Sequence, residues 1–136
     1  MTVFRKIIAA GAAVVAMAAA PGIARTPASF EGLWSRGDGK ARVRIKPCNA
    51  GLCAVNIWVR QGTPHEKVGD RLEMKVTETR QAQWTGTAYD PQRRLKMKLI
   101  VDVSETSMIT RGCLFMGLAC KSMTWTRIVD EASGSS

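Results

Sequence analysis

The sequence predicts an all-β protein in which eight antiparallel strands close into a single barrel after an N-terminal export segment. The first observation is an alternation of apolar and polar residues with a period of two over most of residues 30–128, which is typical of strands buried on one face. The second is the set of short Gly- and Pro-containing turns between these segments. The third is that no helical apolar stripe follows residue 24. We expect a closed barrel because closure removes the exposed strand edges of an open sheet.

Residues 1–24 have the three-part layout of a secretory signal peptide. An Arg-Lys pair precedes an apolar run over Ile7–Ala20, and small residues end the segment, which suggests cleavage after Ala24. The alternative is an uncleaved amphipathic anchor. A transmembrane helix is not expected, because the apolar run is shorter than the roughly 20 residues that a bilayer requires.

Residues 25–129 are expected to form the barrel domain, and residues 130–136 (DEASGSS) a flexible polar tail. The whole chain has 20 basic and 11 acidic residues; without the two basic residues of the export segment, 18 minus 11 leaves a net charge of +7. The export segment looks bacterial, so we expect a periplasmic protein, with secretion beyond the periplasm as the alternative. The oligomeric state stays open.

The first three strands are expected over Phe30–Arg36, Ala41–Lys46 and Cys53–Val59. The second of them, ARVRIK, alternates without a break, so its apolar side chains lie opposite its cations. In the third, we expect Val55 and Ile57 to share the inner face. The sequences Gly-Asp-Gly and Asn-Ala-Gly mark the two hairpin turns between these strands.

The later strands follow the same logic. RLEMKVT and QWTGTAY each place apolar residues at every second position, and LKMKLIVDV forms the longest alternating run. Asp-Pro marks the turn before that run, and Gly-Asp ends the loop over residues 61–70. The five strands are expected over residues 71–77, residues 83–89, Leu95–Val103, Thr106–Gly112 and Ser122–Ile128.

All four cysteines lie in the exported part of the chain, where disulfides persist. Of the three pairings that four cysteines allow, we favour Cys48–Cys53 and Cys113–Cys120, because each pair flanks a Gly-containing turn. The alternative is a zinc site. Only the first pair meets the usual zinc-ligand spacing, and His65, the sole histidine, is remote from both pairs. We therefore expect no metal.

The first and last strands carry residues suited to closing one end of the barrel. In a closed barrel Gly32 and Trp34 lie on a strand next to that of Trp125 and Arg127, and a guanidinium can stack on an indole face. Gly32 leaves room for this approach. The arrangement resembles the lipocalins and their calycin-type relatives, in which a Gly-x-Trp near the start packs under an arginine of the last strand.

A second resemblance covers nearly the whole exported chain. GLWSRGDGKARVRIKPC, the LC of the next hairpin, GTAYDP and RGCLFMGLACKSMTWTR occur in this order and resemble the bacterial domain-of-unknown-function family 2147 (DUF2147). The resemblance implies an exported lipocalin-like barrel with a ligand cavity, and it supplies no catalytic residues. The segment QGTPHEKVGD is shorter than its counterpart in that family, which leaves open whether the loop over residues 61–70 gates a site.

No group of titratable residues indicates catalysis, so we expect no enzyme activity, no catalytic residue and no cofactor. His65 lies alone in a Pro-flanked, charged loop. The acids are scattered along the chain, and turn formation accounts for Asp38 and Asp90. The serines lack a neighbouring base, and no Gly-rich phosphate loop precedes a helix.

The central functional question is whether the barrel is filled with side chains or holds one small ligand, since eight strands allow either. We expect a carrier or sensor of a small apolar or amphipathic molecule. Methionines in the strands fit core packing better than copper binding, and their flexible side chains suit varied apolar ligands. The expected pocket residues are Val43, Ile45, Val55, Ile57, Leu72, Met74, Trp84, Met97 and Leu99.

The alternative is an envelope-interaction module whose basic outer face binds an anionic polymer, a lipid surface or a protein. Arg42, Arg44 and Lys46 share one strand face, and Lys96 and Lys98 share another. Nucleic acid is not an expected partner, because no exposed aromatic residues interleave with these cations. A cavity would favour the first hypothesis, and a packed barrel the second.

Overall fold

The structure, a computed structural model, describes residues 11–12, 29–49 and 51–129. The predicted signal peptide, apart from residues 11–12, and the predicted tail lie outside the described residues. Within the described part, no helix has the length and apolar character needed to span a membrane. The strands are β1 (Gly32–Arg36), β2 (Ala41–Cys48), β3 (Gly51–Val59), β4 (Arg71–Arg80), β5 (Gln83–Asp90), β6 (Leu95–Val103), β7 (Ser107–Leu114) and β8 (Ala119–Arg127), and one 3-10 turn, η1 (Phe115–Gly117), lies between β7 and β8.

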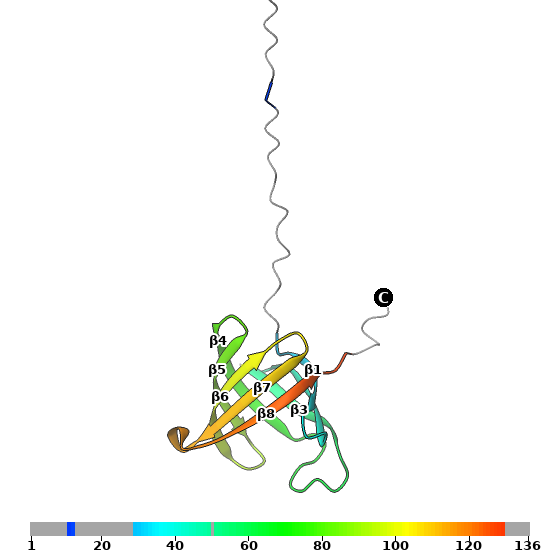
Figure 1. The fold of residues 1–136 in the computed structure, drawn as a ribbon. Coiled ribbons are helices and arrows are strands. Elements are labelled where there is room, and N and C mark those ends of the chain that lie inside the picture. Colours follow the sequence, from blue (N-terminus) through cyan, green and yellow to red (C-terminus); the bar gives the residue numbers. More distant parts are fainter. Residues whose placement is uncertain (1–10, 13–28, 50, 130–136) are drawn as a thin grey trace, which may run out of the picture.

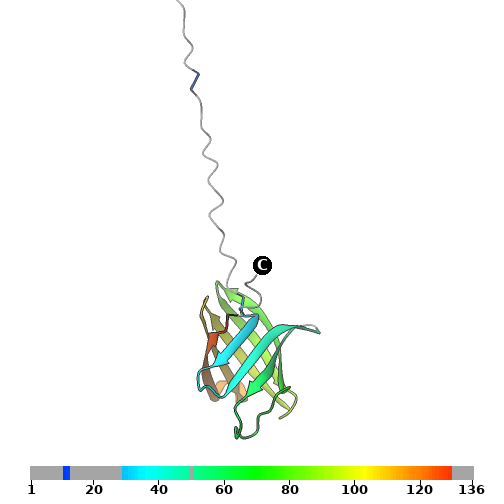
Figure 2. The ribbon, with the colours of Figure 1, turned by 90° about the vertical axis from the view of Figure 1, so that its right-hand side faces the viewer.

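The eight strands form one closed antiparallel barrel, as the sequence predicted (Figure 1 and Figure 2). Each strand pairs with the next, and β1 closes the barrel on β8, with Trp34 opposite Arg127. In β2, Ala41, Val43 and Ile45 are buried while the residues between them are exposed. This one-sided pattern is the reason why the sequence indicated a barrel with an apolar interior.

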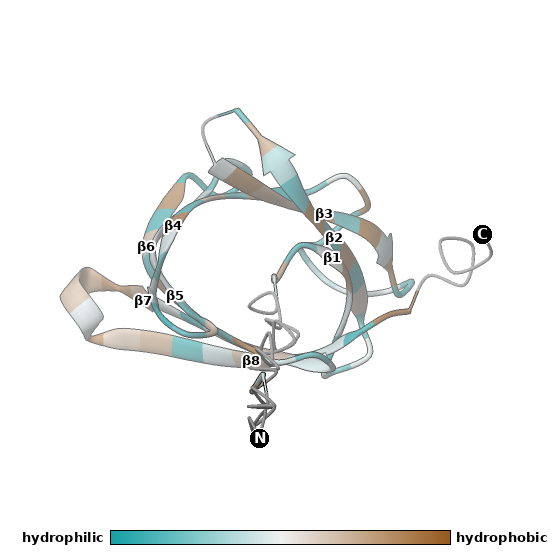
Figure 3. Cartoon of the chain, turned by 90° about the horizontal axis from the view of Figure 1, so that it is seen from above, coloured by the Kyte–Doolittle hydropathy of each residue, from teal (hydrophilic) through white to brown (hydrophobic). Residues whose placement is uncertain are grey.

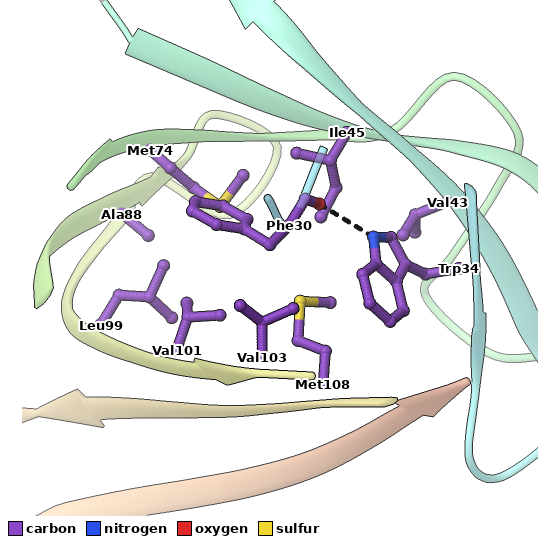
Figure 4. Close-up of a cluster of buried hydrophobic side chains, with 10 residues drawn as sticks. All are labelled: Phe30, Trp34, Val43, Ile45, Met74, Ala88, Leu99, Val101, Val103 and Met108. Atoms are coloured by element: carbon purple, nitrogen blue, oxygen red, sulfur yellow. Dashed lines mark hydrogen bonds between the residues drawn. The ribbon is translucent and has the colours of Figure 1, made fainter. Parts of the chain in front are cut away.

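The two ends of the barrel differ. The end that we call the closed end holds Phe30 and the β2–β3, β4–β5 and β6–β7 turns, and the opposite end, which we call the mouth, holds residues 61–70 and the turns after β1, β5 and β7 (Figure 1). A buried apolar cluster packs inside the barrel (Figure 4). Its members are Phe30, Trp34, Val43, Ile45, Met74, Ala88, Leu99, Val101, Val103 and Met108.

Arg127 covers Trp34 at the closed end, as predicted. The Cζ atom of Arg127 lies 4.2 Å from the centre of the Trp34 ring, and the guanidinium donates to the carbonyl oxygens of Ser29, Glu31 and Glu105 at 2.7, 3.0 and 2.8 Å. Burial lowers the pKa of Arg127 from its ordinary value. The group thus ties the chain entry and the β6–β7 turn to β8.

The backbone φ of +123° favours glycine at position 32, although a Cβ atom there would only touch the Arg127 guanidinium, at 3.4 Å. Trp125 lies on the same seam, opposite Arg36. Its side chain does not cover the closed end: its Nε1 donates to Thr110 Oγ1 at 3.0 Å, farther inside the barrel.

We expect Arg127→Ala to destabilise the protein by about 1–3 kcal/mol, because it removes the stacking contact and leaves three carbonyl groups without their donor. The emission of Trp34 should also change as its ring gains contact with water. Melting temperature and tryptophan fluorescence measure both effects. Arg127→Lys keeps the charge but not the planar guanidinium, so its melting temperature should lie between those of the parent protein and Arg127→Ala. An unchanged melting temperature in Arg127→Ala would contradict the prediction.

The inner face of β3 is not the one that the sequence suggested. Ala54 pairs with Ile45 and Asn56 with Val43, so these residues face inward, while Val55 lies on the outer face and Ile57 is exposed. Placing Val55 and Ile57 inside was therefore wrong. Alternation pointed to the wrong face because the inward residues Ala54 and Asn56 are less apolar than Val55 and Ile57. An irregularity in the pairing between Arg42 and Val43 also shifts the register.

Both predicted disulfides are present, Cys48–Cys53 across the β2–β3 hairpin and Cys113–Cys120 across the β7–β8 hairpin. Cys113 and Cys120 are directly opposite each other in the sheet. The four sulfurs are therefore bridged and are not available as zinc ligands. Two disulfides indicate an oxidising, extracytoplasmic environment.

Candidate functional site

A cavity of about 540 Å³ occupies the mouth half of the barrel. This volume lies within the range of about 300–1,000 Å³ that is common for small-molecule sites. Its inner wall is apolar and includes Val43, Ile45, Ala54, Leu72, Met74, Met97, Leu99, Met108, Met123 and Trp125. Its rim is polar and includes Arg36, Asn56, Glu66, Asp70, Arg71, Asp90, Gln92, Arg93 and Lys121, and Thr110 lies farther inside.

The structure brings most of the predicted pocket residues together. Those that line the cavity are Val43, Ile45, Leu72, Met74, Met97 and Leu99. Trp84 does not line it: its ring packs edge-on against Phe30, with 5.2 Å between ring centres, at the closed end. The indole Nε1 of Trp84 is buried without a hydrogen-bond partner among the described residues. Val55 and Ile57 lie outside the barrel, on the outer face of β3.

Small side chains on opposite walls make the space. Ala54 of β3 and Gly112 of β7 both face the cavity, and these strands lie on opposite sides of the eight-stranded ring. A Cβ atom on Gly112 would come within 3.0 Å of Met97 Sδ. At the closed end, by contrast, the inward positions carry the large rings of Phe30 and Trp34. Two large rings thus help to fill the closed end, whereas Ala54 and Gly112 add little bulk to the mouth half.

Arg36 and Glu66 form an ion pair at the mouth. Arg36 Nη2 donates to Glu66 Oε2 at 2.7 Å, and a second, parallel bond joins Nη1 to Oε1. Arg36 Nε also donates to Asp38 at 2.9 Å. The hydrogen bond from Arg36 lowers the pKa of Glu66, and the hydrogen bond to Glu66 raises the pKa of Arg36 above its ordinary value. The pair fastens the loop over residues 61–70, which we call the mouth loop, to β1.

The β5–β6 turn holds the mouth loop from another side. Asp90 accepts hydrogen bonds from the backbone N–H groups of Gln92 and Arg93 and from both of their side chains, at 2.7–3.1 Å. Arg93 then donates to the carbonyl oxygen of His65 at 2.8 Å. Burial opposes ionisation of Asp90, but the hydrogen bonds from Arg93 and Gln92 outweigh it and lower the pKa of the carboxyl. Asp90 and Arg93 thus anchor the mouth loop to the turn.

We expect these anchors to weaken in acid. A carboxyl whose pKa is lowered by folding stabilises the folded state above its unfolded pKa, and this contribution is lost as the pH falls through the folded value. The ordinary values are 3.8 for Asp90 and 4.5 for Glu66, so the loss begins near those values and deepens below them. Melting temperature measured against pH checks the effect. Asp90→Asn should melt lower at neutral pH and fall less steeply in acid; parallel profiles would contradict the prediction.

Lys121 differs from the other cations of the rim. Arg36, Arg71 and Arg93 each pair with a carboxylate, whereas the side chain of Lys121 has no ion pair or hydrogen bond among the described residues. Sequence reasoning missed the rim residues because they meet only through the turns of the fold. Within residues 29–49 and 51–129, no group of three or more His, Cys, Asp or Glu side chains is arranged to hold a metal ion.

Comparison with known proteins gives a family but no function. A family model described as "Uncharacterized protein conserved in bacteria" (DUF2147) matches residues 32–127. No curated protein matches the chain significantly. Among solved structures, a redesigned β-barrel matches with 16% sequence identity and a TM-score of 0.46, covering 74% of this chain and 91% of the barrel.

Proposed function

The chain belongs to the DUF2147 family of uncharacterized bacterial proteins, and we propose that it binds a small apolar or amphipathic ligand inside its barrel, without catalysing a reaction. The observation that carries the proposal is the cavity of about 540 Å³ with an apolar wall. A barrel that served only as a scaffold would gain stability by filling this volume.

The composition of the wall favours a ligand with a flexible hydrocarbon part. Met74, Met97, Met108 and Met123 all line the cavity. A methionine side chain is unbranched and polarisable, so it adapts its shape to different apolar groups. The four together suit a class of related ligands better than one rigid molecule.

The rim favours a ligand with an acidic head group. The carboxylates of Glu66 and Asp90 are already paired with Arg36 and Arg93, so they would attract a cationic ligand only weakly. Lys121 lines the cavity without such a partner in the described part of the chain. A carboxylate or phosphate at the mouth would lie beside this ammonium group while its apolar part lies against the wall. We therefore propose an amphipathic anion.

The compartment that we propose is the bacterial periplasm. Two disulfides support an extracytoplasmic location, and the predicted signal peptide would direct the chain there. In that setting the protein would act as a carrier or sensor of its ligand.

Native mass spectrometry of protein purified from the periplasm without detergent tests the proposal. We expect a population whose mass exceeds that of the processed chain by a bound small molecule. Trp125 offers a second readout, because it lines the cavity: a brominated long-chain fatty acid should quench its emission, and Trp125→Phe should remove that part of the quenching. A ligand-free mass that persists after incubation with lipid extracts, together with no quenching, would contradict the proposal.

That outcome would favour the alternative function, in which the outer basic face binds an anionic polymer, a lipid surface or a protein. Arg42, Arg44 and Lys46 lie exposed on the outer face of β2, and Arg42 stacks over Trp58, with its Cζ atom 5.1 Å from the ring centre. The cavity favours the first function, because its walls are built from inward-facing apolar residues.

A further inference from the structure

Three large apolar side chains lie exposed at the end of the β7–β8 hairpin. Phe115, Met116 and Leu118, which we call the apolar tip, have exposed fractions of 75%, 105% and 89%. The hairpin end stands outside the ring of strands in Figure 3 and projects sideways from the barrel, on the side of the mouth, in Figure 1. Side chains of this kind are normally buried, and a group of them at one exposed point marks an interaction site.

The hairpin restricts the backbone that carries these side chains. The disulfide Cys113–Cys120 joins the two strands directly below the tip. Phe115, Met116 and Gly117 have left-handed backbone conformations, with φ values of 51°, 57° and 94°, so the chain reverses within a short turn. A stapled tip loses little conformational freedom when it enters an apolar phase.

The chain on either side of the tip is basic and contains no acid. From Ser107 to Val129 the sequence has no Asp or Glu. Lys98 lies directly opposite Cys113 in the sheet, and Lys121 follows Cys120. Lys98, Arg111 and Lys121 have no ion pair within the described residues. An apolar projection next to unpaired cations is complementary to a lipid bilayer whose head groups are anionic and whose acyl chains lie beneath them.

We propose that the apolar tip inserts into the surface of a bilayer that contains anionic lipids. Phe115, Met116 and Leu118 enter the boundary between head groups and acyl chains, and Lys98 and Arg111 contact the lipid phosphates. The same hairpin carries Lys121 in the cavity wall, so docking holds the mouth of the barrel close to the bilayer. This inference does not depend on what the cavity binds.

Flotation of the processed protein with vesicles tests the proposal. We expect binding to vesicles of phosphatidylglycerol and phosphatidylethanolamine, little binding to phosphatidylcholine vesicles, and weaker binding in high salt. Met116→Ser with Leu118→Ser should weaken binding to anionic vesicles at least about tenfold. The matched control is Val68→Ser with Ile109→Ser, which removes two other exposed apolar side chains (63% and 49%) and should leave binding unchanged.

A third variant reports insertion directly. Leu118 has an ordinary right-handed backbone conformation, so Leu118→Trp should fold normally, and its emission should shift to shorter wavelength on addition of anionic vesicles. Equal binding of the tip variant and the parent protein, or no shift of the Leu118→Trp emission, would overturn the proposal. A third outcome would also overturn it: the parent protein does not bind vesicles but self-associates in solution, and the tip variant does not self-associate. The tip would then be a contact site for a second copy of the chain.

Discussion

A protein that carries Ala54→Trp and Gly112→Leu should fold and lose its ligand. The two residues face the cavity from opposite walls, so the added indole and isobutyl groups meet across the space that the ligand occupies. The Met97 side chain near Gly112 is flexible and can move aside. We expect binding of the brominated fatty acid to weaken by about a hundredfold or more, because the apolar part of the ligand loses most of its contacts.

The control for this variant uses the outer face of the same two strands. Ile57 and Ile109 are both exposed there, so Ile57→Trp with Ile109→Leu adds a comparable ring without entering the cavity. Fluorescence quenching measures binding in each protein, and melting temperature confirms that each is folded. The cavity variant should keep its melting temperature within a few degrees, since filling a void offsets moderate overpacking. Full binding by the cavity variant would exclude the barrel interior as the site.

Trp34→Ala should destabilise the protein more than Arg127→Ala does. The side chain is fully buried, its Nε1 donates to the carbonyl oxygen of Phe30 at 2.9 Å, and its face supports Arg127. Removing a buried tryptophan costs about 3–5 kcal/mol, a large part of the stability of about 5–15 kcal/mol that is usual for a domain. We expect a protein that unfolds at much lower denaturant concentration.

Guanidinium unfolding measures this loss, and Trp34→Phe separates its causes. Phenylalanine keeps an aromatic face under Arg127 but cannot donate to Phe30, so it should recover part of the lost stability and leave the closed end intact. If Trp34→Ala lowered the free energy of unfolding by less than about 1 kcal/mol, the stacked Trp34 and Arg127 would not be what stabilises the closed end.

The fold was predictable because most strands have one apolar and one charged face. In β2, Val43 and Ile45 alternate with Arg44 and Lys46, so burial of one face fixes both the strand and its orientation. The hairpin turns and the cysteine pairs then fix which strands are neighbours. The stacking of Arg127 on Trp34 followed from the closure of the barrel.

The cavity and its rim were less predictable, for two physical reasons. In β3, Val55 and Ile57 are more apolar than Ala54 and Asn56, so the alternation in the sequence points to the wrong face as the inner one. The rim depends on contacts between turns distant in the chain. Arg36 and Glu66 pair across 30 positions, and no periodicity links them. The hollow half could be recognised only once Ala54 and Gly112 were placed opposite each other.

The order of pairing in the barrel also has a consequence for how the chain folds. Every pair of neighbouring strands except β1 with β8 is joined by a single connection, of which residues 60–70 form the longest, and both disulfides lie within single hairpins, with sequence separations of 5 and 7. The two cysteines of each disulfide therefore meet early in folding, because closing so short a loop costs little entropy. The seam between Trp34 and Arg127 joins the two ends of the domain and forms against the largest entropic cost. We expect the correct thiol pairing to be reached before that seam forms, so oxidative refolding should need little disulfide isomerisation.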